Sequence, residues 1–489
     1  MNRCTVNLIE VVDSLLPLQI YGNIDIGITG VAFDSRKVQA GDVFIAIAGL
    51  KQDGNAFQRQ ALDSGAVAII AEAKPQIDTA PYIQVQDARR ALAVLASAYS
   101  GHPDRSLRLT GITGTNGKTT TAYLTRSILQ AAGHHTGLIS TIEYISGEQS
   151  IQAERTTPDA LEINRLLSEM VETGATHTVM EVTSHGLQQK RTYGLEFDRA
   201  VFSNFARDHL DYHGSQEHYL QAKLQLFKRL TNDAIAIVNA DDPVSQIIQK
   251  QTKARTWNYG IRSRSAPFTG EVIEMEQSKM RVEMNLRGKK LRLTTPFLGE
   301  HNLYNLLAAA VVGMSYGIEP ATIGSGLESL KSIPGRMEFI KSKHPFDVII
   351  DFAHTPEALE RILLTVRSFC PGRVILVFGC GGERDSGKRP QMGRIAEQFA
   401  DHIILTSDNP RSEDPEKILH DIDAGITDKS RRKVAPERKL ALVEALQKAR
   451  PGDVVLITGK GHEIYQEIAG KKRSFADRVV VEEYLYGLS

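Results

Sequence analysis

One stretch decides the fold: Leu107-Arg-Leu-Thr-Gly-Ile-Thr-Gly-Thr-Asn-Gly-Lys-Thr-Thr-Thr121 reads as a strand, a glycine-rich loop and the start of a helix. In that order, the loop N–H groups and the positive end of the helix point at an anion. Lys118 is placed to reach the terminal phosphates of a nucleotide, and the Thr119 hydroxyl to bind Mg²⁺. The residues expected to form this phosphate cradle are Gly114, Thr115, Asn116, Gly117, Lys118, Thr119 and Thr120.

The loop is a variant of the phosphate-binding pattern, because Ile112 stands where the strict pattern has a glycine. Its context favours the assignment: Leu107 and Leu109 suit a buried strand, and Gly133 suits the end of the helix. The alternative is a glycine-rich turn that holds no ligand. We favour the loop, since such a turn has no structural need for a lysine and a threonine after its last glycine.

Length and composition describe an ordinary globular protein of two to four domains, with 489 residues, 42% of them hydrophobic. The 58 basic and 58 acidic residues balance, so we expect no nucleic-acid partner. Cys4, Cys370 and Cys380 show neither metal spacing nor a disulfide framework, which suits a cytoplasmic protein. Glu10 and Asp13 interrupt the apolar stretch that a signal peptide would need. The sequence contains no run of about 18 apolar residues, so we expect no membrane span.

The order of elements predicts α/β units in succession. Residues 1–103 alternate short strands with helices, and the expected elements are strands at 43–47 and 66–71 and a helix at 91–99. The phosphate-binding loop opens a second unit with strands at 178–182, 200–204 and 234–239. Residues 255–298 alternate polar and apolar residues about a hairpin turn at Arg287-Gly288-Lys289.

A helix at 302–316 follows, and near Pro334-Gly335-Arg336 the pattern starts again. The strands expected in this last, doubly wound unit lie at 348–351, 374–378, 403–406 and 454–458. Each of them ends in a charged or glycine-containing loop, at 351–356, 379–385, 407–411 and 459–463. Any one loop is explained by ordinary turn chemistry. Four of them on the carboxyl edge of one parallel sheet favour a ligand pocket.

Two segments of the central unit also carry chemistry. Glu181 ends a buried strand, where a P-loop enzyme places a Mg²⁺-binding acid. His209 lies in a cluster of histidines, aspartates and an arginine that follows another strand, so it is a candidate metal or phosphate ligand. A single histidine is more often a packed residue, and no tetrahedral zinc spacing is present. By composition, Lys223 is an ordinary surface lysine.

Six motifs together resemble the Mur ligases, and the likeness runs from about residue 30 to 465. They are Gly114-Thr-Asn-Gly-Lys-Thr-Thr120, Glu181-Val-Thr-Ser-His-Gly186, Arg207-Asp-His-Leu-Asp-Tyr-His213, Gly299-Glu-His-Asn302-Leu-Tyr-Asn305, Gly335-Arg-Met-Glu338 and Asp351-Phe-Ala-His-Thr-Pro356. The resemblance implies a small N-terminal α/β domain (1–103) for the UDP part of the substrate, a central P-loop α/β ATPase domain (104–335) and a C-terminal Rossmann-like α/β domain (336–489) for an amino acid. It also implies a cytoplasmic monomer that uses ATP and Mg²⁺.

The resemblance assigns further residues. Ser35 matches the UDP-contacting position, and the other matches to contacts of the UDP-dipeptide substrate are Thr156, Thr157, Thr183, Gln189 and Arg191. Lys223 matches a lysine that the family carbamylates, which overrules its reading as a surface residue. The implied metal shell is Thr119, Glu181, His209 and the Lys223 carbamate, with Lys118 catalytic beside them. Asn302, Arg336 and Asp351 match nucleotide contacts.

The implied reaction is ATP-dependent amide ligation through an acyl phosphate, between UDP-N-acetylmuramoyl-L-alanyl-D-glutamate and meso-diaminopimelate. The residues expected to bind diaminopimelate are Arg384, Asp408, Asn409, Pro410, Arg411, Gly459 and Glu463. Arg411 can grip the distal carboxylate, which lysine lacks. With lysine bound we expect an unpaired buried guanidinium, at a cost of about 2–5 kcal/mol. The alternative is that Arg411 caps its loop or pairs with Glu413 in solvent.

The chain departs from the family pattern at two positions. Thr183 stands where serine is usual, and Ser407 precedes Asp408 where an acid is common. Three rival functions stay open at this point: a lysine-adding ligase of the same family, a folylpolyglutamate or cyanophycin synthetase, and a non-catalytic nucleotide switch. Arg411 and the four C-terminal loops disfavour the synthetases. Release of ADP and phosphate that depends on an amino acid separates a ligase from a switch.

Overall fold

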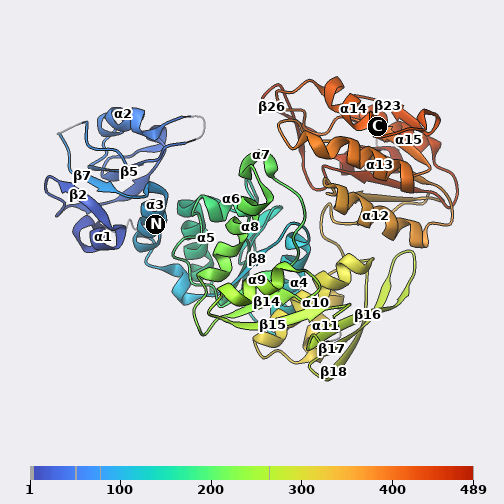
Figure 1. The fold of residues 1–489 in the computed structure, drawn as a ribbon, viewed down its shortest axis with the longest axis horizontal. Helices are drawn as coiled ribbons and strands as arrows, with labels where there is room; N and C mark the ends of the chain where they lie inside the picture. Colours follow the sequence, from blue (N-terminus) through green and yellow to red (C-terminus); the bar gives the residue numbers. More distant parts are fainter. Residues whose placement is uncertain (1–4, 50–51, 77–78, 264, 488–489) are drawn as a thin grey trace.

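Three lobes follow one another along the chain in the computed structural model (Figure 1). The structure describes residues 5–49, 52–76, 79–263 and 265–487, so Cys4 lies outside it. Each lobe is built around its own β-sheet, with helices packed on the sheet faces. The α/β fold class that the sequence predicts is therefore confirmed.

The N-terminal lobe holds a five-stranded sheet in the order β2-β7-β6-β5-β4. Its strands are β2 (Pro17–Tyr21), β4 (Gly30–Ala32), β5 (Asp42–Ala46), β6 (Ala68–Ala71) and β7 (Tyr82–Val85). Only β2 runs antiparallel to its neighbour. Its helices are α1 (Leu8–Leu15), α2 (Gln58–Asp63) and α3 (Ala88–Tyr99), and a short pair, β1 (Val6–Asn7) with β3 (Gly27–Ile28), lies apart from the sheet.

The central lobe contains an eleven-stranded sheet in the order β11-β10-β9-β12-β8-β13-β14-β15-β16-β17-β18. Its first eight strands in chain order are β8 (Arg108–Thr113), β9 (Thr136–Ile139), β10 (Glu143–Ser146), β11 (Gln149–Gln152), β12 (His177–Glu181), β13 (Arg199–Phe202), β14 (Ile235–Asn239) and β15 (Arg255–Gly260). The last three are β16 (Phe268–Met275), β17 (Met280–Leu286) and β18 (Lys289–Thr295). The strand of the phosphate-binding loop, β8, is central and parallel to both neighbours.

Helices cover both faces of this sheet. They are α4 (Lys118–Ala131), α5 (Ala160–Glu172), α6 (Ser184–Gln188), α7 (Leu210–His213), α8 (Gln216–Lys228), α9 (Val244–Gln251), α10 (Glu300–Ser315) and α11 (Pro320–Ser329). One face packs against α4 and α10, and the other packs against α5 and α8. The apolar stripe of α4 meets α10 and α11, which fixes the helix that follows the phosphate-binding loop.

The expected hairpin forms with a shorter turn than predicted. Lys289 already belongs to β18, so Arg287 and Gly288 alone make the turn, with φ of 55° and 87°. Two consecutive residues with positive φ match the right-handed twist of the flanking strands. Another boundary also moved: β13 ends at Phe202, two residues before the expected end, which frees Ser203 and Asn204 for the site.

The C-terminal lobe is a six-stranded sheet in the order β19-β20-β24-β21-β22-β23, and only the edge strand β19 is antiparallel. Its strands are β19 (Glu338–Ile340), β20 (Asp347–Asp351), β21 (Val374–Phe378), β22 (His402–Leu405), β23 (Arg432–Val434) and β24 (Val454–Thr458). Its helices are α12 (Pro356–Phe369), α13 (Arg389–Phe399), α14 (Pro415–Asp423), α15 (Arg438–Lys448) and α16 (Asp477–Tyr486). A hairpin of β25 (Tyr465–Ile468) and β26 (Lys471–Ser474) completes the lobe.

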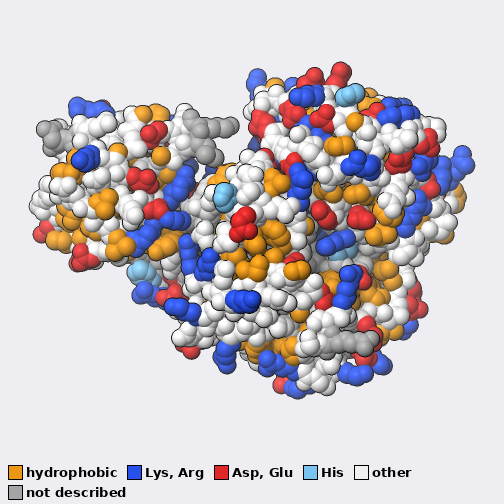
Figure 2. Space-filling view, in the orientation of Figure 1, with side chains coloured by type: hydrophobic (Ala, Val, Ile, Leu, Met, Phe, Trp, Pro, Cys, Tyr) orange, Lys and Arg blue, Asp and Glu red, His pale blue; other side chains and the backbone are white. Residues whose placement is uncertain are grey.

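The central and C-terminal lobes share one apolar core, which joins the α4–α10 face to α12 and α13. Figure 2 shows basic, acidic and histidine side chains gathered where these two lobes meet. Among the described residues, no helix is long and apolar enough to cross a membrane.

Candidate active site

The phosphate-binding loop runs from the end of β8 to the first turn of α4, as the sequence predicts. A side chain at Gly114 would collide with the Ser203 hydroxyl, so this position requires glycine. The loop is held from below: Ser203 Oγ donates to the Asn116 carbonyl at 2.6 Å, and Asn116 N–H donates to Asn204 Oδ1 at 3.0 Å. Ser203 and Asn204, which the sequence reasoning missed, therefore fix the conformation of the loop in the absence of a ligand.

Lys118 lies inside this loop. Its ammonium donates to the carbonyls of Gly114 at 3.0 Å and Thr115 at 2.9 Å. Burial lowers the pKa of Lys118. The position therefore brings a half-buried basic group to the point where the N–H groups of the α4 N-terminus converge.

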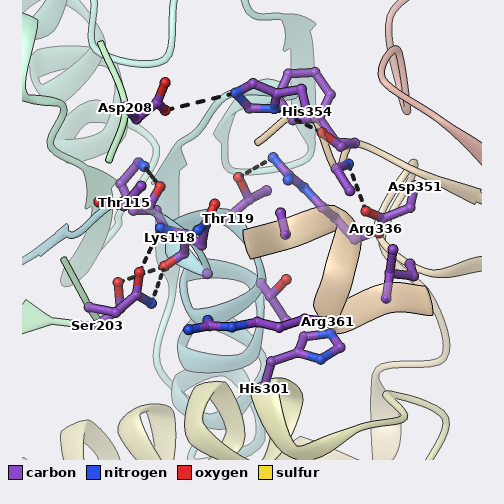
Figure 3. A pocket seen from close by; sticks show the side chains of 18 of the residues that line it. Thr115, Lys118, Thr119, Ser203, Asp208, His301, Arg336, Asp351, His354 and Arg361 are labelled. Atoms are coloured by element: carbon purple, nitrogen blue, oxygen red, sulfur yellow. Dashed lines mark hydrogen bonds and ion pairs between the residues drawn. The ribbon is translucent and has the colours of Figure 1, made fainter. Parts of the chain in front are cut away.

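Glu181 is fully buried at the end of β12 and accepts from three donors. The hydroxyls of Thr119 and Thr141 donate to Oε2 at 3.0 and 3.1 Å, and the Thr141 N–H donates to Oε1 at 2.8 Å. Arg336, from the start of the C-terminal lobe, donates to the Thr119 hydroxyl at 2.9 Å (Figure 3). The Thr119–Glu181 pair expected of a P-loop enzyme is thus assembled, with Thr141 as an additional, unforeseen partner.

Lys223 is not a surface residue, and its reading from composition was wrong. The side chain on α8 is 2% exposed, lies against the Tyr219 ring and donates to the Gly114 carbonyl at 2.7 Å. Burial, together with the charge of Lys118, lowers the pKa of Lys223 well below its usual value. A lowered pKa favours the free amine, which is the nucleophilic form of lysine that reacts with carbon dioxide.

His209 is the N-cap residue that precedes α7, and it lies in the left-handed region with φ of 55°. Its Nε2 lies 3.4 Å from the Asp208 carboxylate and its ring packs edge-on to His185. Burial lowers the pKa of His209, which keeps the imidazole neutral and able to act as a ligand. Asp208 also lies 4.0 Å from His354 of the C-terminal lobe, so this segment faces both lobes (Figure 3).

These side chains suit a hard cation, although the described residues hold no group of three or more His, Cys, Asp or Glu arranged for a metal. The Thr119 hydroxyl and the Glu181 carboxylate are oxygen donors of the kind Mg²⁺ prefers. A carbamate on Lys223 would add two more oxygens beside Gly114. The donor chemistry therefore fits Mg²⁺ if Lys223 is modified.

Five of the six expected contacts of the UDP-dipeptide gather beside Glu181. Thr157 Oγ1 donates to the Glu181 carbonyl at 2.8 Å, and the Thr183 hydroxyl donates to Thr157 Oγ1 at 3.0 Å. Thr183 also caps α6, so its hydroxyl already accepts the Gly186 N–H. The remaining contacts here are Arg191 Nη1 to the Thr157 carbonyl, Arg191 Nη2 to Gln189 Oε1, and Thr141 Oγ1 to Thr156 Oγ1. Ser35 is the exception, because it lies in the N-terminal lobe and donates to Gln60.

One cavity of about 870 Å³ joins the phosphate-binding loop to the C-terminal lobe. The expected residues that line it on the central side are Thr115, Asn116, Gly117, Lys118, Thr119, Thr120, Thr156, Glu181, Thr183, His209 and Asn302. Those on the C-terminal side are Arg336, Asp351, Arg384, Asp408, Asn409, Arg411, Gly459 and Glu463. Outside the lining lie Ser35, Gly114, Thr157, Gln189, Arg191, Lys223 and Pro410.

Family models match all three lobes. They are the Mur ligase family catalytic domain at residues 27–100, the Mur ligase middle domain at 112–313 and the Mur ligase glutamate ligase domain at 335–461. The chain belongs to the Mur ligase family. Membership confirms the enzyme class expected from the sequence, an ATP-dependent ligase.

Individual relatives agree with the family. The "UDP-N-acetylmuramoyl-L-alanyl-D-glutamate--2,6-diaminopimelate ligase" of Solibacter usitatus is 44% identical, over 94% of each chain. The protein of the same name from Syntrophomonas wolfei subsp. wolfei is 42% identical over 98% of this chain and 99% of its own. A solved structure titled with that name is 31% identical over 99% of each chain, with a TM-score of 0.70. The MurF ligase of Thermotoga maritima, solved with ADP, shares the fold at 21% identity over 94% of this chain and 98% of its own, with a TM-score of 0.65.

The C-terminal loops of this Mur ligase are held by a dense polar network. Arg411 Nη1 donates to the Gly382 carbonyl at 2.5 Å, and Arg411 Nε lies 3.6 Å from Glu467. The alternative pairing with Glu413 is wrong, because both Glu413 oxygens accept from Arg389 at 2.7 Å. Since Arg411 has protein partners of its own, lysine in the pocket would not leave it unpaired, and the expected cost of 2–5 kcal/mol was too high.

Two crossed ion pairs link the loops of the two larger lobes. Arg384 lies 3.5 Å from Asp211, and Arg207 lies 3.2 Å from Asp385. Arg384 is thus held by a central-lobe carboxylate, at the cavity position where we expected it to meet a substrate.

Asn302 and Asp351 line the cavity of the Mur ligase, yet their polar atoms serve the protein first. Asn302 Nδ2 donates to the Leu298 carbonyl at 2.9 Å. The Asp351 oxygens each accept a backbone N–H, from Met337 and Ala353, at 2.7 Å. Both residues therefore shape the cavity wall, and each carboxylate oxygen of Asp351 retains one further lone pair.

The missed residues share a signal that the sequence does carry. Thr141 follows β9, and Ser203 and Asn204 follow β13, so all three come just after parallel strands of the central sheet. The carboxyl ends of such strands meet at one edge, where ligands bind. Attention to every strand end, rather than to charged residues alone, would have found them.

Proposed function

We propose that this Mur ligase joins meso-diaminopimelate to UDP-N-acetylmuramoyl-L-alanyl-D-glutamate at the expense of ATP. The observation that carries the proposal is the single cavity in which the phosphate-binding loop faces the strand-end loops of the C-terminal lobe. The name shared by the relatives at 40–44% identity supports the same substrates.

The proposed chemistry has two steps. The D-glutamyl carboxylate attacks the γ-phosphate of ATP, and the bond to the bridging oxygen of ADP breaks, which gives an acyl phosphate. The amine of the amino acid then attacks the acyl carbon, loses a proton and expels inorganic phosphate. Lys118 offsets negative charge on the phosphates during the first step, and positioning supplies most of the remaining acceleration.

Thr119, Glu181, His209 and a carbamylated Lys223 would hold Mg²⁺ in this proposal. The ion would neutralise charge on the phosphate oxygens. The chain prepares the site through Thr141, whose N–H and hydroxyl orient Glu181. Arg336 orients the Thr119 hydroxyl from the other lobe.

Substrate placement follows the lobes. Ser35 contacts the UDP group, and the dipeptide lies along Thr156, Thr157, Thr183, Gln189 and Arg191. Gly114 to Thr120 with Asn302, Arg336 and Asp351 hold ATP. The diaminopimelate site is formed by Arg384, Asp408, Asn409, Pro410, Arg411, Gly459 and Glu463. We further propose domain limits at 1–103, 104–335 and 336–489 and a cytoplasmic monomer.

The decisive experiment measures ADP and phosphate release with the UDP-dipeptide and a panel of amino acids that includes diaminopimelate, lysine and glutamate. Release that requires both the UDP-dipeptide and diaminopimelate is expected. Release that requires the UDP-dipeptide and lysine, but does not occur with diaminopimelate, would assign the protein to the lysine-adding ligases. Release without any amino acid would contradict ligation altogether.

A further inference from the structure

Lys460 is a buried cation that none of the proposed roles uses. It follows β24 and Gly459, and its side chain is 0% exposed. Its ammonium donates to Asn409 Oδ1 at 3.0 Å and to Glu463 Oε2 at 2.9 Å. Both partners line the cavity, whereas Lys460 lies behind them. Burying an ammonium costs several kcal/mol before its partners compensate, so a lysine here calls for a reason beyond filling space.

The bonds to Lys460 fix the amide of Asn409. Asn409 Oδ1 accepts from the Lys460 ammonium and from the Glu467 N–H at 2.9 Å. With two donors on the oxygen, the amide nitrogen must turn the other way, and it donates to Glu463 Oε2 at 2.7 Å. Without Lys460, the amide oxygen would keep only the Glu467 N–H, and the side chain would lose its link to the Lys460 ammonium.

The same bonds fix one oxygen of Glu463. Oε2 accepts from both Lys460 and Asn409, and these two bonds fix the orientation of the carboxylate. Among the described residues no donor bonds to Oε1, so Oε1 is the oxygen that a ligand ammonium can reach. A second carboxylate, that of Asp408, lies next to Gly459, where any side chain would collide with it. Lys460 thus stands behind a pocket wall that carries two acids.

We propose that Lys460 is a positioning residue for the incoming amino acid, acting through Asn409 and Glu463. It holds Glu463 Oε1 toward the distal ammonium of the amino acid, and its charge offsets one of the two acids in the empty pocket. The inference rests on the proposed function for the identity of the amino acid, but not for the geometry. The network is rigid because each polar atom in it, apart from Oε1, is bonded within the protein.

The test is Lys460→Met, which keeps the length of the side chain and removes the ammonium. We expect kcat/KM for the amino acid to fall about 10- to 100-fold, mainly through KM, because a displaced carboxylate misplaces the amine. The KM values for ATP and for the UDP-dipeptide should stay within about twofold. Equal changes in all three KM values, or no change in the first, would overturn the proposal.

Arg373→Met is the matched control. Arg373 pairs with the buried Asp453 at 2.6 Å at the amino ends of β21 and β24, the end of the sheet opposite the pocket. Its loss should lower the melting temperature without changing KM for the amino acid. A rise in that KM equal to the rise in Lys460→Met would show that both variants act through general loss of stability, and would overturn the positioning role.

Two further measurements separate this inference from the proposed function. In a Glu463→Gln background, Lys460→Met should have a smaller effect on kcat/KM than in the wild type, since the two residues act as one unit. Fully additive effects would count against it. Crystal structures of the wild type and Lys460→Met need no turnover: unmoved Asn409 and Glu463 side chains would overturn the inference, even if diaminopimelate proved to be the wrong substrate.

Discussion

The Arg336 guanidinium donates to the Thr119 hydroxyl at 2.9 Å. This hydrogen bond links the start of the C-terminal lobe to α4, the helix that follows the phosphate-binding loop. Arg336 also lies over the Phe352 ring at 4.7 Å. Among the described residues its buried Nε has no partner, although the side chain lines the cavity. Because an unbonded buried donor is costly, this nitrogen is available to an anionic ligand. We propose that a nucleotide phosphate binds here, where the two lobes meet.

Lys118→Ala should lower turnover by several hundredfold while the protein stays folded. Loss of a positive charge at the transferred phosphate costs about 3–4 kcal/mol, or several hundredfold in kcat. Amino-acid-dependent phosphate release and a thermal melt measure the two parts of this statement. Near-normal release by the folded variant would refute the phosphate-binding role of Lys118.

Lys223→Ala should be inactive, and a small carboxylate such as acetate or formate should restore part of the activity. The buried amine is expected to carry a carbamate, and an added carboxylate supplies equivalent oxygens. Lys228→Ala is the control, because this lysine on the same helix is exposed and donates to Gln221. Full activity of Lys223→Ala, or equal stimulation of both variants by acetate, would rule out the carbamate.

Arg411→Ala should reduce discrimination between diaminopimelate and lysine by about 10- to 100-fold, which corresponds to about 1–3 kcal/mol. The guanidinium is placed by the Gly382 carbonyl and can still bind a distal carboxylate with its remaining N–H groups. The ratio of kcat/KM for the two amino acids is the measurement, with Arg431→Ala, which pairs with Asp428 outside the cavity, as control. Unchanged discrimination would remove Arg411 from substrate recognition.

Acid should destabilise the protein in part through His177. This ring packs against His134 and Tyr316, and burial lowers its pKa from 6.5 to about 4. Between these values the unfolded chain binds more protons than the folded one, so stability falls as pH drops from about 6.5 to about 4.

The variant His177→Phe should flatten this dependence. One proton accounts for at most about 1.4 kcal/mol per pH unit. Melting temperatures between pH 4 and 7 provide the measurement, and His218→Gln, at an exposed position, should retain the wild-type slope. An identical slope in His177→Phe would show that His177 does not contribute.

The sequence by itself determined the phosphate-binding loop, the hairpin near Gly288 and the strand-end loops of the last unit. These features are local: hydrophobic periodicity and turn residues within a few positions encode them, and the carboxyl ends of parallel strands must lie at one edge. The candidate residues at 351, 384, 408 and 459 could therefore be placed on one edge without coordinates. Boundaries shifted by one or two residues, as at Phe202, because strand ends depend on the hydrogen bonds of neighbouring strands.

Only the tertiary structure decided how these parts act together. Lys223 is an ordinary helix residue in the sequence, and only the packing of α8 against the loop at Gly114 buries its amine and lowers its pKa. Glu413 is close to Arg411 in sequence, yet its carboxylate forms an ion pair with Arg389 instead. The partnership of Asn409 with Lys460 joins loops that follow different strands. Burial, desolvation and the choice among competing partners depend on distant segments that pack together, and no local pattern records them.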